Sequence, residues 1–339
     1  MSDLTFLPAA AMAAKIRETQ ISAVDLAEAH LAKIERLNPK LNAFVHIDPE
    51  RVRRAARDAE SAVARGEALG PLHGVPISVK SSVNVAGMKC ESGTRLRAGT
   101  VAGEDAPLVA RLRKAGAIIL GVTNTPELLM AWETDNLLYG RTNSPWDLER
   151  TPGGSSGGEA AAIAAGMSAG GVGSDGGGSI RVPAHFSGIC GLKPTPGRVP
   201  STGHFPPSGG PFSLLGVVGP MARTVEDLQI LFEVMQGLDD GDACAAPVPM
   251  RWPSDEQVCI RDRHHVLSAA HKAGIADKPA EDRVGHAGHR GQNGCGSNAH
   301  IADLKRVRHL RALRCDGGVC RIFPEFLHLS TSLPSPRRH

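Results

Sequence analysis

The stretch Thr151–Ala184, TPGGSSGGEAAAIAAGMSAGGVGSDGGGSIRVPA, decides the fold expected of this chain. Eleven of its 34 residues are glycine, and seven of these lie in two Gly/Ser clusters, Gly153–Gly158 and Gly176–Ser179. An Ala-rich run between the clusters, Glu159–Ala169, is built of strong helix formers. Glycine loses more backbone entropy on folding than any other residue, so such clusters indicate backbone that must approach a ligand closely. We therefore expect two loops, tied to one helix, that present hydroxyl and N–H groups to a common point.

Two apolar runs that precede this stretch predict buried strands. Val75–Val79 follows a segment that is rich in proline and glycine, and Ala117–Val122 follows a predicted helix, Asp105–Ala115. Strand, helix and strand at this spacing are typical of βαβ units and of a mixed α/β sheet. Lys80 stands at the carboxyl end of the first strand, where the binding sites of open α/β sheets lie.

Further elements are expected after the Gly/Ser clusters. Gly171–Asp175 and Leu214–Val218 are predicted to be strands, and Ile180–Ala184 is predicted to begin a helix. Thr224 caps a clearly amphipathic helix, Val225–Met235. With 339 residues, the chain can form one large or two ordinary domains.

Composition narrows the class of protein. The net charge of +3 implies neither a nucleic acid nor a membrane partner, and no apolar run approaches the ~20 residues of a membrane span. The N-terminal residues show no signal-peptide pattern, and seven scattered cysteines do not make a disulfide framework. We therefore expect a cytoplasmic protein, and a homo-oligomer is compatible with this composition.

Two interpretations of the Gly/Ser region are disfavoured. A phosphate-binding loop would require GxxxxGKS/T, which is absent, or GxGxxG placed between a strand and a helix, and we expect no such placement here. Gly153–Gly157 does match the nucleophile elbow GxSxG, but an elbow follows a strand, whereas a polar segment with a proline precedes this one. The elbow would also need a histidine, and neither His185 nor His204 stands at a predicted strand end.

A Ser–Ser–Lys arrangement fits the region better. Ser179 is the candidate nucleophile, Ser155 the proton relay and Lys80 the base, provided that burial holds the lysine neutral near pH 7. The candidate donors to the oxyanion are the backbone amides of the three glycines before the nucleophile, Gly176, Gly177 and Gly178.

Five blocks, in order over residues 5–250, resemble the amidase signature family. They are Gly74–Lys80, Thr123–Glu127, Asn143–Asp147, Thr151–Glu159 and Gly173–Pro183. The resemblance implies an α/β fold with a mixed β-sheet core covered by α-helices. It also implies hydrolysis of the C–N bond of a small-molecule amide through an acyl-enzyme, with no cofactor and no metal.

The resemblance also implies roles for individual residues. Ser179 resembles the nucleophile, Lys80 the base, and Ser155 the bridging serine whose preceding peptide bond is cis. The three glycines correspond to the oxyanion loop. Three further residues look like those that hold this arrangement in place: Ser156, Asp175 and Arg181.

The last 89 residues differ from the rest. Residues 251–339 carry a net charge of +6 against −3 for residues 1–250, with nine of the 14 His and four of the seven Cys. The resemblance fades at Arg251–Val258, so we expect a catalytic core over residues 1–250 and a C-terminally incomplete fold. We interpret residues 251–339 as a basic His/Arg/Cys-rich tail that is out of frame or disordered.

The tail offers no second function. It has few aromatic side chains for a nucleic-acid arm, and Cys315 and Cys320 lack the spacing of a known metal site. Two alternatives to an active amidase stay open. One is a truncated, inactive homologue. The other is a glutaminase-type component of a tRNA-dependent amidotransferase, which would require partner subunits.

Overall fold

A mixed six-stranded sheet positions the predicted site. The computed structural model describes residues 3–207, 209–246, 315–316 and 319–320. The strands are β1 (Phe44–Ile47), β2 (Pro76–Lys80), β3 (Ile118–Thr123), β4 (Gly170–Asp175), β5 (Cys190–Gly191) and β6 (Val217–Ala222). Their order across the sheet is β1-β3-β2-β4-β6-β5. Strand β2 runs parallel to β3 and β4, while the other three pairings are antiparallel, which confirms the predicted mixed sheet.

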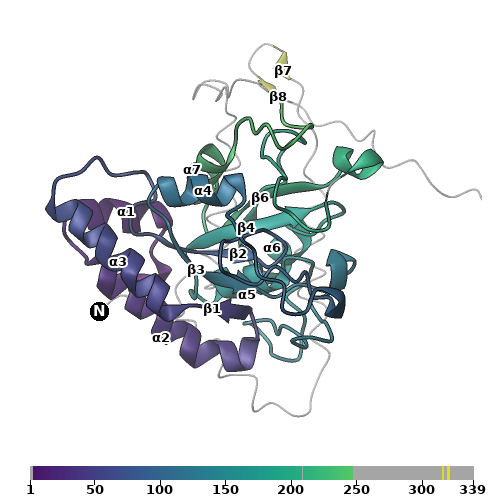
Figure 1. The fold of residues 1–339 in the computed structure, drawn as a ribbon, viewed down its shortest axis with the longest axis horizontal. Helices are drawn as coiled ribbons and strands as arrows, with labels where there is room; N and C mark the ends of the chain where they lie inside the picture. The colour runs from purple at the N-terminus through teal and green to yellow at the C-terminus, as the bar shows by residue number, and fades with distance from the viewer. Residues whose placement is uncertain (1–2, 208, 247–314, 317–318, 321–339) are drawn as a thin grey trace, which may run out of the picture. The chain divides into compact units, whose positions relative to one another are not determined.

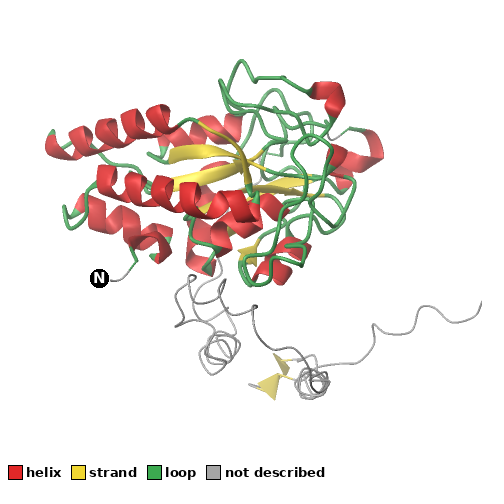
Figure 2. Cartoon of the chain, turned by 90° about the horizontal axis from the view of Figure 1, so that it is seen from below, coloured by secondary structure: helices red, strands yellow, loops and turns green. Residues whose placement is uncertain are grey.

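Helices cover this sheet, as Figures 1 and 2 show. They are α1 (Ala9–Arg17), α2 (Ala23–Leu41), α3 (Pro49–Ala64), α4 (Pro107–Lys114), α5 (Gly157–Ala164), α6 (Arg181–Ser187) and α7 (Val225–Met235). Successive side chains of a strand point to opposite faces. Ile119 accordingly packs in one apolar cluster with residues of α1, α4 and α7. Ile118 and Leu120 pack in a second cluster, with residues of α2 and α5.

Helix α5 is shorter than the predicted run Glu159–Ala169. It ends at Ala164 because Gly166 takes a φ of +70°, in the left-handed region that glycine favours. A side chain at this position would also approach the ring of Phe6 to 2.9 Å. The early end frees the following residues to enter β4.

The strand predicted at Leu214–Val218 is displaced. Gly210–Leu214 forms a 3₁₀ turn, and β6 begins at Val217 and continues through Pro220. Proline cannot donate to a ladder, so Gly219-Pro220 is typical of a turn rather than of a strand between two neighbours. The carbonyl of Pro220 nevertheless accepts a 3.1 Å hydrogen bond from Leu192 N. The prediction was wrong here because tertiary pairing outweighs local preference.

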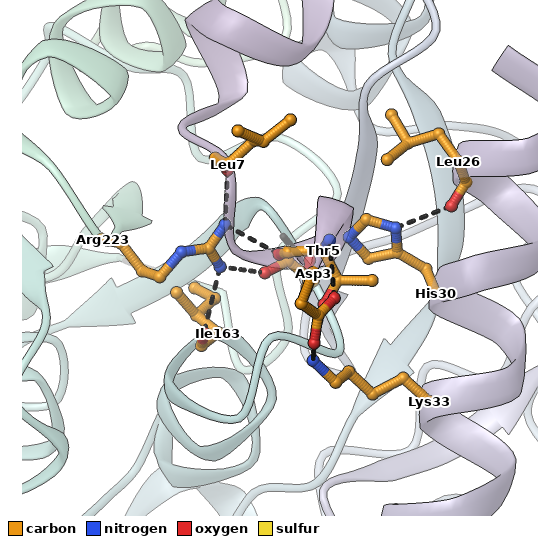
Figure 3. A network of polar contacts seen from close by, with 9 residues as sticks. Asp3, Thr5, Leu7, Leu26, His30, Lys33, Ile163 and Arg223 are labelled. Carbon is orange, nitrogen blue, oxygen red and sulfur yellow. Dashed lines mark hydrogen bonds and ion pairs between the residues drawn. The ribbon is translucent and has the colours of Figure 1, made fainter. Parts of the chain in front are cut away.

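Two basic side chains, Arg223 and the buried Lys33, fasten the segment before α1 to the core, as Figure 3 shows. Arg223 donates to the carbonyls of Thr5 and Leu7 at 3.1 and 2.8 Å. Lys33, which is 3% exposed, donates to Asp3 Oδ2 at 2.5 Å and to Thr5 Oγ1 at 2.6 Å. This clamp joins chain segments that are more than 200 residues apart in sequence.

The chain divides into two compact units, Met1–Ala287 and Gly288–His339. Within the described residues, the second unit consists of an antiparallel pair, β7 (Cys315–Asp316) and β8 (Val319–Cys320). The rest of the predicted tail, residues 251–339, lies outside the described residues. The division at residue 250 therefore stays a prediction.

Candidate active site

Lys80 ends strand β2 inside the protein. Its neighbours Ile77 and Val79 belong to the apolar cluster of α1, α4 and α7. Because strand side chains alternate, Ser78 and Lys80 point to the opposite face, toward α5. The side chain of Lys80 is fully buried.

Serine oxygens surround the amine of Lys80. Its Nζ lies 2.6 Å from Ser155 Oγ, 2.9 Å from Ser156 Oγ and 3.1 Å from Ser174 Oγ. Burial lowers the pKa of Lys80 from its ordinary 10.5 to about 7, against the opposing effect of the charges of Asp175 and Glu159. Such a lysine has a large neutral fraction near pH 7, so it can accept a proton from a hydroxyl.

The two Gly/Ser clusters meet at Ser156 and Ser179. The amide of Ser156 donates to the carbonyl of Ser179 at 3.0 Å, and the Ser156 hydroxyl donates to Ser174 O at 3.3 Å. The Gly154–Ser155 peptide bond is cis, as the resemblance implied. Gly154 is needed because a Cβ there would fall 2.9 Å from the carbonyl oxygen of Ala131.

Ser179 opens onto the same cavity as Ser155. Ser179 is 8% exposed, and its hydroxyl makes no hydrogen bond to any residue that the structure describes. The structure therefore places Ser179 at the cavity but does not join its hydroxyl to that of Ser155 by a hydrogen bond. The predicted nucleophile and relay thus line one space, with the predicted base directly behind Ser155.

The loop before Ser179 differs in one respect from the prediction. The amide of Gly178 donates to Asp175 Oδ1 at 2.7 Å, so it already has an acceptor. Gly178 instead provides the turn, with a φ of +121°. Among the described residues, the amides of Gly176, Gly177 and Ser179 donate no hydrogen bond, so these three can face an oxyanion.

Asp175 organises this turn. It accepts hydrogen bonds from the amides of Gly178, Ile180 and Arg181 and from the Arg181 side chain. Burial alone would raise the pKa of Asp175, but these donors outweigh it and lower the pKa to about 2. The carboxylate is therefore charged at neutral pH and fixes the backbone that carries Ser179.

The cavity has a volume of about 590 Å³. One wall is the segment Leu128–Trp132, and Trp132 Nε1 donates to Gly177 O at 3.1 Å. The remaining lining residues are Ser155, Ser174, Asp175, Gly176, Gly177, Ser179, His204, Pro206, Pro207, Phe212, Gly216 and Val217. The walls are thus largely apolar, and Asp175 is the one carboxylate among them.

Two residues of this region were missed from sequence. His204, which the sequence did not place near a strand end, lines the cavity, with Nδ1 2.8 Å from Pro206 O and Nε2 3.2 Å from Ser82 Oγ. Burial, and then the charge of Lys80, lowers its pKa to about 4. Glu159 lies fully buried beside Lys80, and its sequence signal is a single charge in an otherwise Gly/Ala run.

The described residues give no sign of a metal site. No group of three or more His, Cys, Asp or Glu side chains within them could hold a metal ion. None of the helices in the same residues has the length and apolar character needed to cross a membrane.

Comparison with known proteins identifies relatives. The model of the family described as Amidase matches residues 25–274. A glutamyl-tRNA(Gln) amidotransferase subunit from Carboxydothermus hydrogenoformans is 42% identical over 246 residues, which are 73% of this chain and 50% of the relative. The indoleacetamide hydrolase of Bradyrhizobium diazoefficiens is 43% identical over 243 residues, which are 71% of this chain and 46% of the relative. The chain thus spans about half the length of the curated relatives it matches.

Solved structures agree with these relatives. A bacterial aryl acylamidase of the amidase signature family superimposes with a TM-score of 0.67 at 33% identity, over 72% of this chain and 50% of that chain. A fatty acid amide hydrolase superimposes with a TM-score of 0.70 at 31% identity, over 75% of this chain and 46% of that chain.

Proposed function

The chain belongs to the amidase signature family, and on this basis we propose that it hydrolyses a carboxylic amide to an acid and an amine or ammonia. The observation that carries the proposal is the 2.6 Å contact between Lys80 Nζ and Ser155 Oγ, in a buried position behind a cavity that Ser179 also lines. A lysine whose pKa burial lowers to about 7 suits the task of a base at neutral pH.

The proposed reaction proceeds by proton relay. Neutral Lys80 accepts the proton of Ser155 while Ser155 accepts the proton of Ser179, and Ser179 Oγ attacks the amide carbon. The amides of Gly176, Gly177 and Ser179 hold the oxyanion. The proton then returns through Ser155 to the leaving nitrogen, and the C–N bond breaks. Water finally hydrolyses the ester on Ser179, which releases the acid.

The apolar cavity supports a small, uncharged amide as substrate. Asp175, the one carboxylate among the described lining residues, is already paired with Arg181, so this lining offers no unpaired charge to a charged substrate. A second candidate function is that of a glutaminase-type component, because several relatives are named as subunits of glutamyl-tRNA(Gln) amidotransferase. Free glutamine carries an ammonium and a carboxylate, which the described walls would leave without partners.

We also place this activity in the cytoplasm. The three cysteines that the structure describes, Cys90, Cys190 and Cys244, are free thiols, and free thiols persist in reducing compartments.

Labelling of the full chain with a fluorophosphonate serine probe tests the proposal. We expect labelling confined to Ser179, none in Ser179→Ala, and a reduction of about 10³-fold or more in Lys80→Ala at neutral pH. Near-normal labelling of Lys80→Ala would overturn the relay. A folded sample that takes no label would support the truncated, inactive alternative.

A substrate assay then separates the two candidate functions. A chain that takes the label is offered an uncharged aryl amide and, in parallel, free glutamine. Release of arylamine without ammonia from glutamine supports the amidase, and the reverse supports the glutaminase-type component.

A further inference from the structure

Glu159 is a buried carboxyl to which the proposed reaction assigns no task. It lies on α5, four residues after Ser155, and its side chain is fully buried. Its Oε1 pairs with Ser78 Oγ on β2, and its Oε2 lies 2.8 Å from Thr123 Oγ1 on β3. The carboxyl therefore bridges α5 to two neighbouring strands through two hydroxyls.

The space around this carboxyl is shaped to hold it. Gly171 of β4 lies opposite, and a Cβ at that position would fall 1.9 Å from Glu159 Oε1 and 2.4 Å from Ser78 O. Three adjacent strands thus enclose the carboxyl, with no room for a side chain on β4. This close fit fixes the carboxyl beside Lys80.

Glu159 and Lys80 are neighbours without being an ion pair. Ser78 and Lys80 point to the same face of β2, and the side chains of Lys80 and Glu159 are both fully buried. Lys80 Nζ contacts serine oxygens, and no ion pair in the described part of the chain includes Lys80 or Glu159. Two buried charges that do not touch carry a large desolvation cost, so the neutral forms of both groups are favoured.

The pKa shifts of the two groups both favour the neutral form, as the geometry does. Burial raises the pKa of Glu159 to about 8, although Ser78, Thr123 and the charge of Lys80 oppose this shift. Burial lowers the pKa of Lys80 to about 7. Both shifts favour the neutral forms near neutral pH, a protonated carboxyl and an unprotonated amine.

The other charges near this pair are accounted for. From β4, Asp175 acts on Lys80, but Arg181 pairs with it. His204, on the cavity wall, is neutral above a pKa of about 4. Among the described residues, Lys80 is the one titratable group whose charge acts on Glu159.

We infer that Glu159 is a positioning residue that acts through Lys80. In its neutral form, held between β2 and β3, Glu159 carries no negative charge. It therefore does not stabilise the protonated form of Lys80. The role assigned to Lys80 rests on the proposed function, whereas the protonation of Glu159 does not. The negative charge of an ionised Glu159 acts on Lys80 in the direction that favours the protonated amine.

Infrared difference spectroscopy of the full chain tests the charge of Glu159 without any need for activity. We expect the carbonyl stretch of a protonated carboxylic acid in the unaltered protein at neutral pH. The band should fade as pH rises through about 8 and be absent from Glu159→Gln, which keeps the shape of the side chain. A neutral-pH spectrum of the unaltered protein without this band overturns the inference, whether or not the variant folds.

The pH profile of labelling by the fluorophosphonate probe tests the effect on Lys80. Since glutamine mimics a neutral acid, Glu159→Gln should keep the acid limb of the profile in place and lose the decline above pH ~8. A downward shift of the acid limb by about one pH unit or more would show that Glu159 is charged in the unaltered protein, and would overturn the inference. If neither protein takes the label, the proposed function fails, while the infrared band still decides the protonation of Glu159.

Discussion

Arg181 binds Asp175 through two hydrogen bonds: Nε donates to Oδ2 at 2.9 Å, and Nη2 donates to Oδ1 at 3.0 Å. The two partners differ in environment, because the Asp175 side chain is 0% exposed and the Arg181 side chain is 56% exposed. The pair lies where β4 ends and α6 begins, so it ties the turn that carries Ser179 to the sheet. We infer that the geometry of this turn depends more on the buried carboxylate than on its exposed partner.

Asp175→Asn tests this dependence. The amide group keeps the shape but loses the charge that three backbone amides and a guanidinium recognise. We expect the free energy of unfolding to fall by about 2 kcal/mol and the labelling of Ser179 to fall at least tenfold. Arg181→Met is the matched control and should cost less than about 1 kcal/mol, because its partner keeps its backbone donors. Equal losses in the two variants would contradict this view.

Trp132→Phe tests the contact between the cavity wall and the oxyanion loop. The variant keeps an aromatic ring but loses the 3.1 Å hydrogen bond to Gly177 O. We expect labelling of Ser179 to slow about three- to tenfold, which corresponds to about 1 kcal/mol, with little change in melting temperature because Trp132 is 65% exposed. Trp146→Phe is the control. It loses a similar 2.8 Å bond, to Ser187 O, outside the cavity lining, and slowing of both variants alike would argue against a specific role of Trp132.

Gly171→Ala tests the fit around Glu159. The new Cβ would overlap both the carboxyl and the carbonyl of Ser78, so we expect a loss of several kcal/mol of stability, on the order of 3 kcal/mol or more. Gly103→Ala is the control, since nothing lies within 4 Å of its added Cβ, and it should change stability by less than about 0.5 kcal/mol. Urea unfolding of both variants measures the difference, and a Gly171→Ala protein of unchanged stability would refute the packing described here.

The burial of His30 leads us to expect that the protein loses stability in mild acid. Burial lowers the pKa of His30 from 6.5 to about 4, and Nδ1 lies 2.9 Å from Leu26 O in the network of Figure 3. Between these two pKa values the unfolded chain binds the extra proton, so stability is complete above pH 6.5 and falls as the pH falls toward 4. From pH 7 to pH 5 this group should remove about 2 kcal/mol. Urea unfolding of the unaltered protein and of His30→Gln at both pH values isolates this share, and identical pH slopes would contradict the prediction.

Sequence reasoning succeeded where local chemistry is sufficient. Helix Val225–Met235 forms with the predicted bounds, because Thr224 accepts from Asp227 N as its N-cap and an apolar stripe follows. The two Gly/Ser clusters were likewise predicted to come together at one point. They do so, because the amide of Ser156 donates to the carbonyl of Ser179. Patterns within a few residues of one another were enough for these elements.

Other features depend on partners that are far away in sequence. Glu159 looks like an ordinary helix residue until Ser78 and Thr123 are placed beside it, 81 and 36 residues away. His204 was set aside because the loop that carries it crosses the end of β2 only in the folded chain, where Phe205 N donates to Ser82 O at 2.7 Å. The acceptor of the Gly178 amide could not be inferred from spacing, since the turn decides which amides converge.

The clamp on the segment before α1 has a consequence for synthesis of the protein. Thr5 leaves the ribosome 218 residues before its partner Arg223, which at ordinary elongation rates is a delay of roughly 10 to 40 s. Lys33 lies only 28 residues after Thr5 and is therefore translated much earlier. The two donors of the clamp are thus translated at different times, and Arg223, the later of them, directly follows the last residue of strand β6.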